Sequence, residues 1–214
     1  MTQSIRIDLF TDIVCPWCLI GTARLDQALA TLPDDVEVEI LHHPFLLDPS
    51  TPEAGQNTKE RLSAKYGGDI TAMQARVEAA AHDAGVPLDL SVQPMSYPTI
   101  KPHTLIRLAA PEQQYPLAKA FAAAYFLEGQ DITDNDLLAD IAAAHGYDRD
   151  AAVKLLNDET EAATTKAMAV SASQQGINGV PFFIFNNQFA ISGGQPLDVF
   201  QRAFRVALGE EALN

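Results

Sequence analysis

Positive charge is scarce in this sequence of 214 residues. Lys and Arg number 14 against 28 Asp and Glu, so the formal net charge at pH 7 is −14 and the pI lies near 4.5. Binding to nucleic acid or to an anionic membrane surface depends on Lys and Arg side chains that neutralise phosphates. The composition therefore disfavours both kinds of partner.

Long apolar runs are missing as well. No segment approaches the roughly 18 consecutive apolar residues of a membrane-spanning helix, and the first residues lack the basic and apolar regions of a secretory signal. We therefore expect a cytoplasmic protein that has no membrane partner. Hydrophobic residues still make up 47% of the chain, which is enough for a substantial core.

Cysteine is limited to two residues, Cys15 and Cys18. There is no second cysteine pair, and His42 and His43 are adjacent instead of separated by the gap of about three to five residues found in zinc sites. We therefore expect no metal. A structural disulfide also fits a cytoplasmic chain of this size poorly. The pair instead indicates dithiol chemistry.

Both cysteines lie in the segment Cys15-Pro16-Trp17-Cys18, between two different periodic patterns. Residues 5–10 alternate in the manner of a strand, whereas apolar residues after the segment recur at helical spacing. Proline suits the first position of a helix because its missing N–H would have no partner there. Pro16 therefore predicts that Cys15 caps the helix.

This placement predicts different roles for the two thiols. The Cys15 sulfur would face unpaired backbone N–H groups and the positive end of the helix dipole, so we expect a partly exposed nucleophile with a lowered pKa. Cys18 lies almost one turn further along, on the core side, so we expect a buried resolving thiol. Two thiols at this spacing complete a disulfide-exchange cycle without a cofactor.

The middle of the chain predicts a long helical region. Residues 36–40 form a second strand, which is parallel to the first because a right-handed crossover connects them. Residues 58–175 show helical patterns throughout. Within them we expect Thr71 to cap one helix and Pro102 and Pro116 to open two others.

The last part of the chain predicts a hairpin and a helix. Residues 182–185 and 189–191 read as two strands joined by the turn Asn186-Asn187. An amphipathic helix follows Pro196. The predicted fold class is therefore α/β, with a large all-helical insertion between the second and third strands.

Several short segments accompany this order of elements: FTDIVCPWC (10–18), IG (20–21), HPFLLDP (43–49), AYFLEG (124–129), GVPFF (179–183) and SGGQP (192–196). In these segments and in the order of its elements, the sequence resembles proteins of the thioredoxin-like fold in its DsbA-like form, over essentially its whole length. More closely, it is similar to the FrnE branch of that family, which is related to 2-hydroxychromene-2-carboxylate isomerases and kappa-class glutathione transferases. The resemblance implies a discontinuous thioredoxin-like domain of residues 1–57 and 176–214, and a helical insertion subdomain of residues 58–175.

The resemblance also implies further site residues. Pro181 would be cis, would face the dithiol and would count as catalytic together with Cys15 and Cys18. His103 stands where the branch usually carries a histidine, either as a substrate contact or as a packed side chain. The residues expected to contact substrate are Pro16, Trp17, Val180, His103 and Gln195.

The leading functional hypothesis is a thiol–disulfide oxidoreductase that acts on protein or small-molecule disulfides, with glutathione possible as a co-substrate. One alternative is a glutathione-dependent isomerase or transferase, although those relatives usually have serine in place of Cys15. A second alternative is a chaperone-like binding module. We expect a monomer or homodimer, and a substrate pocket on the insertion near residues 98–103 or near Tyr125 and Phe126.

Overall fold

The computed structural model describes residues 3–67 and 69–212. At its centre is a mixed four-stranded sheet. The strands lie in the order β2-β1-β5-β6, and their bounds are Gln3–Thr11 (β1), Val36–Pro44 (β2), Phe182–Phe185 (β5) and Phe189–Ser192 (β6). β1 runs parallel to β2 and antiparallel to β5, and β5 pairs antiparallel with β6. The predicted strand–helix–strand unit and hairpin are both confirmed.

The hairpin turn depends on local backbone chemistry. Asn186 and Asn187 have φ values of 51° and 54°, in the left-handed region that asparagine tolerates better than most residues. The Asn186 side chain also accepts a hydrogen bond from Arg6 N at 2.8 Å and donates one to Ala207 O at 3.0 Å. The turn is thereby tied to β1 and to the last helix.

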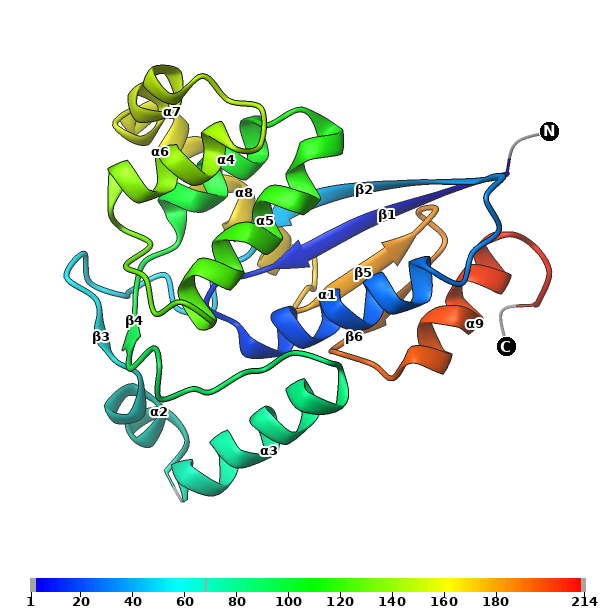
Figure 1. The fold of residues 1–214 in the computed structure, drawn as a ribbon, viewed down its shortest axis with the longest axis horizontal. Coiled ribbons are helices and arrows are strands. Elements are labelled where there is room, and N and C mark those ends of the chain that lie inside the picture. The colour runs from blue at the N-terminus through cyan, green and yellow to red at the C-terminus, as the bar shows by residue number, and fades with distance from the viewer. Residues whose placement is uncertain (1–2, 68, 213–214) are drawn as a thin grey trace.

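Two helices, α1 (Pro16–Leu29) and α9 (Leu197–Ala207), pack together on one face of the sheet (Figure 1). Side chains alternate along each strand, so Leu9 and Phe183 point into this core while Phe10 and Phe182 point to the opposite face. Ala172, on a later helix, packs against that opposite face. The members of the first core with no exposed surface are Ile7, Leu9, Leu25, Ala28, Phe183, Phe185 and Phe200.

Most of the residues between β2 and β5 form helices that gather at one end of the sheet (Figure 1). Their own core is continuous with the N-terminal segment, because Ile13 and Ile20 belong to the same buried cluster as Leu105, Leu117 and Phe121. The helices are α2 (Thr58–Tyr66), α3 (Ile70–Asp83), α4 (Ile100–Leu108), α5 (Pro111–Phe126), α6 (Asn135–Ala143), α7 (Arg149–Leu156) and α8 (Glu159–Gln174).

We had expected this region to be helical throughout, and that expectation is wrong. Two short strands, β3 (Gln56–Asn57) and β4 (Met95–Ser96), pair antiparallel beside α2. Their two-residue length leaves no period from which a sequence pattern could predict them. The division into units at residues 57/58 and 175/176 stays a prediction. Within the described ranges, no helix has the length and apolar character needed to cross a membrane.

Three predicted helix starts are wrong. Asp69, not Thr71, caps α3, since its carboxylate accepts hydrogen bonds from the first N–H groups of the helix. α4 begins at Ile100, two residues before Pro102. Pro116 lies inside α5, which begins at Pro111. The helix tolerates Pro116 because Glu112, whose carbonyl loses its usual partner, is exposed to water.

Candidate active site

The dithiol lies at the N-terminus of α1, as predicted. Cys15 is the N-cap residue, with extended backbone angles, and Pro16 takes the first helical position. The backbone N–H of Cys18 donates to the carbonyl of Cys15 at 3.0 Å, which closes the first turn and places both thiols on it. Both cysteines are free thiols.

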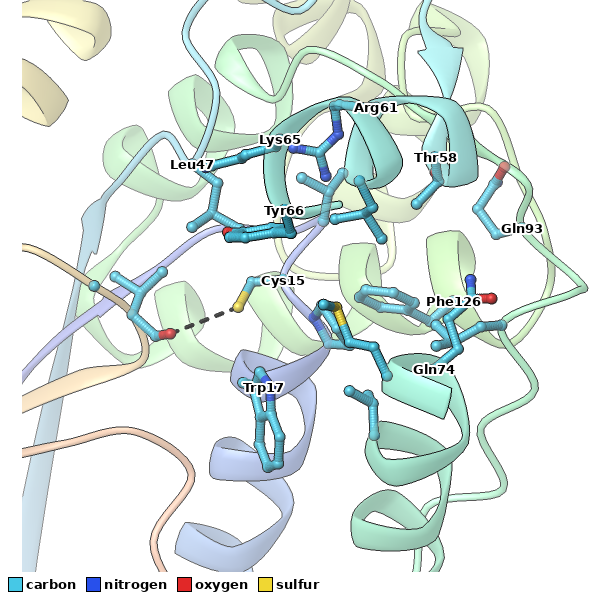
Figure 2. A pocket seen from close by; sticks show the side chains of 18 of the residues that line it. Cys15, Trp17, Leu47, Thr58, Arg61, Lys65, Tyr66, Gln74, Gln93 and Phe126 are labelled. Atoms are coloured by element: carbon cyan, nitrogen blue, oxygen red, sulfur yellow. Dashed lines mark hydrogen bonds between the residues drawn. The ribbon is translucent and has the colours of Figure 1, made fainter. Parts of the chain in front are cut away.

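Cys15 is less exposed than we expected. Its exposed fraction is 4%, the same as that of Cys18, so the expectation of a partly exposed Cys15 is wrong. Its sulfur lies at a cavity wall, where the S–H donates a hydrogen bond to the carbonyl of Val180 at 3.6 Å (Figure 2). Side chains from distant segments, including Leu47 and Tyr66, stand over it and remove it from bulk solvent.

The surroundings of Cys18 favour its protonated form. Burial raises the pKa of the Cys18 thiol well above its ordinary value, and a hydrogen bond with Cys15 and the charges of Cys15 and Asp12 raise it further. A hydrogen bond from the backbone of Asp12 acts in the opposite direction. Cys18 therefore holds its proton at neutral pH and must lose it when it acts as a nucleophile.

Pro181 meets α1 at a glycine. The Val180–Pro181 peptide bond is cis, as predicted, whereas the catalytic role of Pro181 stays a prediction. A Cβ on Gly21 would come within 2.8 Å of the Pro181 Cγ, so only glycine lets the helix approach the proline this closely. The Cα of Gly194 lies 3.4 Å from the same Cβ position. These glycines bring the segment containing Val180 and Pro181 to the N-terminus of α1.

The cavity beside Cys15 has a volume of about 460 Å³, which is in the usual range for small-molecule sites. Tyr125 and Phe126 line it, as predicted, whereas residues 98–103 are not among its lining residues. Pro16, Trp17 and Val180 also line it. The other lining side chains come from the loop after β2 and from α2 and α3, and include Phe45, Leu47, Arg61, Leu62, Lys65, Tyr66, Met73, Gln74 and Val77.

The sequence analysis did not identify α2 as part of the cavity wall. Thr58, Arg61, Leu62, Lys65 and Tyr66 recur at helical spacing and all line the cavity. The spacing itself is visible in the sequence, but α2 has no buried residue and therefore lacks an apolar stripe. Only the position of the helix over Cys15 gives these side chains a role.

Two predicted substrate-contact residues lie away from the cavity. Gln195 is not among its lining residues, and its side-chain amide donates to the carbonyl of Ser192 at 2.7 Å. His103 is completely buried, with its Nε2 3.5 Å from Asp12 Oδ1 and its ring stacked on His42. His103 has no exposed surface with which to contact a substrate, so the alternative of a packed side chain is the one observed.

His42 makes the stability of this region dependent on pH. Burial lowers the pKa of His42 well below its ordinary value, and the charges of His103 and His43 lower it further. Its Nε2 is 2.6 Å from Thr11 Oγ1. The unfolded chain takes up a proton below about pH 6.5 and the folded chain does not, so the stabilisation is complete above that pH and is lost as the pH falls below it.

We therefore expect the free energy of unfolding to fall between pH 6.5 and 5, by at most about 1.4 kcal/mol per pH unit for this one group. A His42→Gln variant keeps a side chain that bonds Thr11 but has no titrating ring, so its loss over the same interval should be smaller. Urea unfolding at several pH values measures both slopes. Equal slopes in the two proteins would show that His42 does not control this dependence.

Comparisons with known proteins agree with this geometry. The family described as DSBA-like thioredoxin domain matches residues 6–205. The uncharacterized protein YwbO of Bacillus subtilis (strain 168) is 28% identical over 212 residues, which cover 94% of this chain and 96% of that protein.

Solved structures show the same fold. The probable DsbA oxidoreductase of Streptomyces coelicolor has a TM-score of 0.83 and 32% identity, over 98% of this chain and 92% of that one. A 2-hydroxychromene-2-carboxylate isomerase has a TM-score of 0.72 but only 16% identity, over 97% and 100% of the two chains, so it supports the fold alone. With a family match along nearly its whole length and a dithiol at the start of α1, the chain belongs to the DSBA-like thioredoxin domain family.

Proposed function

We propose that the protein is a thiol–disulfide oxidoreductase in which Cys15 is the nucleophile and Cys18 the resolving thiol. The observation that carries the proposal is the arrangement of these two groups. Cys15 caps α1 at the wall of a cavity of about 460 Å³, and Cys18, on the same first turn, is shielded behind it. One thiol can therefore meet a substrate from the cavity, and the other can meet Cys15 from the protein side.

The two steps conserve atoms and electrons. The Cys15 thiolate attacks one sulfur of a substrate disulfide, forms a mixed disulfide and releases the other half of the substrate as a thiol. Cys18 then loses its proton and attacks the Cys15 sulfur, which releases the second half as a thiol. The substrate disulfide is reduced to two thiols and the protein dithiol is oxidised to a disulfide. The reverse sequence oxidises a substrate dithiol.

The raised pKa of Cys18 supports this division of labour. A thiol that keeps its proton does not compete with Cys15 for the incoming substrate. Neither step needs a metal or a bound cofactor, and glutathione enters our proposal only as a possible co-substrate. A cytoplasmic location and a monomeric or homodimeric state are further parts of the proposal.

A Cys18→Ser variant tests the assignment of the two thiols. Without a resolving thiol, the first step should stop at a mixed disulfide on Cys15, because serine does not displace the bound half of the substrate. Intact-mass measurement after incubation with glutathione disulfide should show one added glutathione, and peptide mapping should place it on Cys15. The wild-type protein should instead lose two hydrogens and retain no adduct.

The chaperone alternative makes a different prediction. If binding of unfolded chains were the activity, a Cys15→Ser protein would still suppress aggregation and the thiols would be dispensable. An isomerase or transferase would turn over its substrate without oxidation of the dithiol. Absence of an adduct in Cys18→Ser, together with either of these results, would contradict the oxidoreductase proposal.

A further inference from the structure

The cavity beside Cys15 differs in charge from the rest of the molecule. Its charged lining residues, among those that the structure describes, are Arg61 and Lys65, and no Asp or Glu lines it. The whole chain has 28 acidic and 14 basic residues, so a randomly chosen patch would carry more acids than bases. The cavity is therefore a positively charged site in a strongly acidic protein.

Arg61 has a hydrogen-bonding group with no partner in the described part of the chain. Its Nε is buried and unbonded, and its side chain is 14% exposed. The carboxylate of Asp48 is 3.9 Å from the Arg61 Nη1, which is too long for a hydrogen bond. Asp48 is already engaged, because it accepts hydrogen bonds from Ser50 and Gln56. The guanidinium thus forms an ion pair with Asp48 but no hydrogen bond to it, and its N–H groups can donate to an anionic ligand.

The two cations share one face of α2. Arg61 and Lys65 are four residues apart, and Thr58 precedes Arg61 by three, so all three side chains project from the same side of the helix. Figure 2 shows Arg61 above the cavity, with Cys15 and Trp17 on the opposite wall. The apolar side chains of Leu62, Tyr66 and Phe126 line the space between.

We propose that Arg61 and Lys65 form a carboxylate-binding subsite, and that the preferred substrates are small disulfides that carry negative charge. This inference rests on the proposed function and adds the class of substrate to it. A carboxylate bound by Arg61 makes charge-assisted hydrogen bonds, which are stronger than neutral ones. The disulfide of the ligand then faces Cys15, a residue that lines this cavity and is 4% exposed.

Three symmetric disulfides of similar size separate charge from other properties. They are 3,3′-dithiodipropionate, with two negative charges, bis(2-hydroxyethyl) disulfide, with none, and cystamine, with two positive charges. Each oxidises the reduced protein in a single turnover, and the fluorescence of Trp17 reports the reaction because the chain has no other tryptophan. Each rate is divided by the rate of the same disulfide with 2-mercaptoethanol, so that intrinsic reactivity cancels.

We expect the normalised rate to be about 10-fold higher for the anionic than for the neutral disulfide, since one charge-assisted hydrogen bond contributes at least this factor. Cystamine should be the slowest of the three. In Arg61→Gln, the rate with the anionic disulfide should fall about 10-fold while the rate with the neutral one changes less than about 2-fold. Lys65→Gln should show the same pattern with a smaller change.

Lys59→Gln is the matched control. It removes one positive charge from α2 at an exposed position that does not line the cavity. Lys59 is exposed to water, where the Debye length is about 8 Å at an ionic strength of 0.15 M, so its charge acts on the cavity less than the charges of the lining side chains. The control should therefore retain the wild-type order and rates. Circular dichroism and the unchanged rate with the neutral disulfide show that a variant is folded.

The outcomes separate the two levels of the proposal. If no disulfide oxidises the protein, including the neutral one, the proposed function itself fails. If the neutral disulfide reacts but the anionic one has no advantage, or if Arg61→Gln and Lys59→Gln behave alike, the oxidoreductase stands and the carboxylate subsite is wrong.

Discussion

Replacing Cys15 with serine is expected to lower the rate of disulfide exchange by at least about 1,000-fold, because a hydroxyl at neutral pH is a far weaker nucleophile than a thiolate. The substitution is close to isosteric, and the backbone at position 15 already has the extended conformation that serine adopts at an N-cap. The loss should therefore come from chemistry and not from folding.

The measurement is the rate of thiol release from bis(2-hydroxyethyl) disulfide by the reduced protein. Thermal unfolding of Cys15→Ser should give a midpoint close to that of the wild type. Cys18→Ser is the control for the loss of one thiol, since it should still release the first half of the substrate at a rate near that of the wild type. If Cys15→Ser keeps substantial exchange activity while Cys18→Ser loses the first step, the roles of the two cysteines are reversed.

Replacing Asp12 with alanine is expected to lower the free energy of unfolding by about 1–3 kcal/mol, because the backbone N–H of Leu47 loses its acceptor and a stranded donor costs about this much. Asp12 is 2% exposed. Its Oδ2 accepts a hydrogen bond from Leu47 N at 2.8 Å, and its Oδ1 is 3.5 Å from His103 Nε2. One carboxylate thus ties the end of β1 to the loop after β2, while its Oδ1 has no hydrogen bond within the described residues and lies beside His103 of α4.

Urea unfolding measures this effect through the midpoint at constant slope. Asp12→Asn keeps an acceptor for Leu47 N and should cost less than Asp12→Ala. Asp34→Ala is the control for removal of a carboxylate, since Asp34 is exposed and its replacement should change stability by no more than about 0.5 kcal/mol. Equal stability of Asp12→Ala and Asp34→Ala would mean that the buried carboxylate does not connect these segments.

The dithiol and its setting are predictable because the interactions that build them are local. Three features of the sequence specify them within about fifteen residues, a distance at which sequence patterns predict structure. They are the strand period of two, the proline at the first helical position and the two cysteines within one turn. The turn at Asn186 and Asn187 was predictable for the same reason, because two residues define its conformation. The cis bond at Pro181 followed from the family resemblance and not from any local pattern.

The environment of the dithiol was not predictable in this way. Cys15 is covered by Leu47 and Tyr66, and His103 is buried against Asp12 and not in the cavity. Each of these contacts joins residues that are more than thirty positions apart in the chain. A helical period shows which side chains share a face, but it does not show what that face meets.

By itself, the sequence determined the α/β order of elements, the placement of Cys15 at the start of a helix and the burial of Cys18, because these depend on periodicity and on neighbours within a few residues. Only the tertiary structure decided that α2 lies over Cys15, that Arg61 and Lys65 face the cavity and that Cys15 is withdrawn from solvent. The physical reason is that burial and charge in a pocket are properties of side chains brought together by packing, and packing joins segments whose separation in sequence carries no information about their contact.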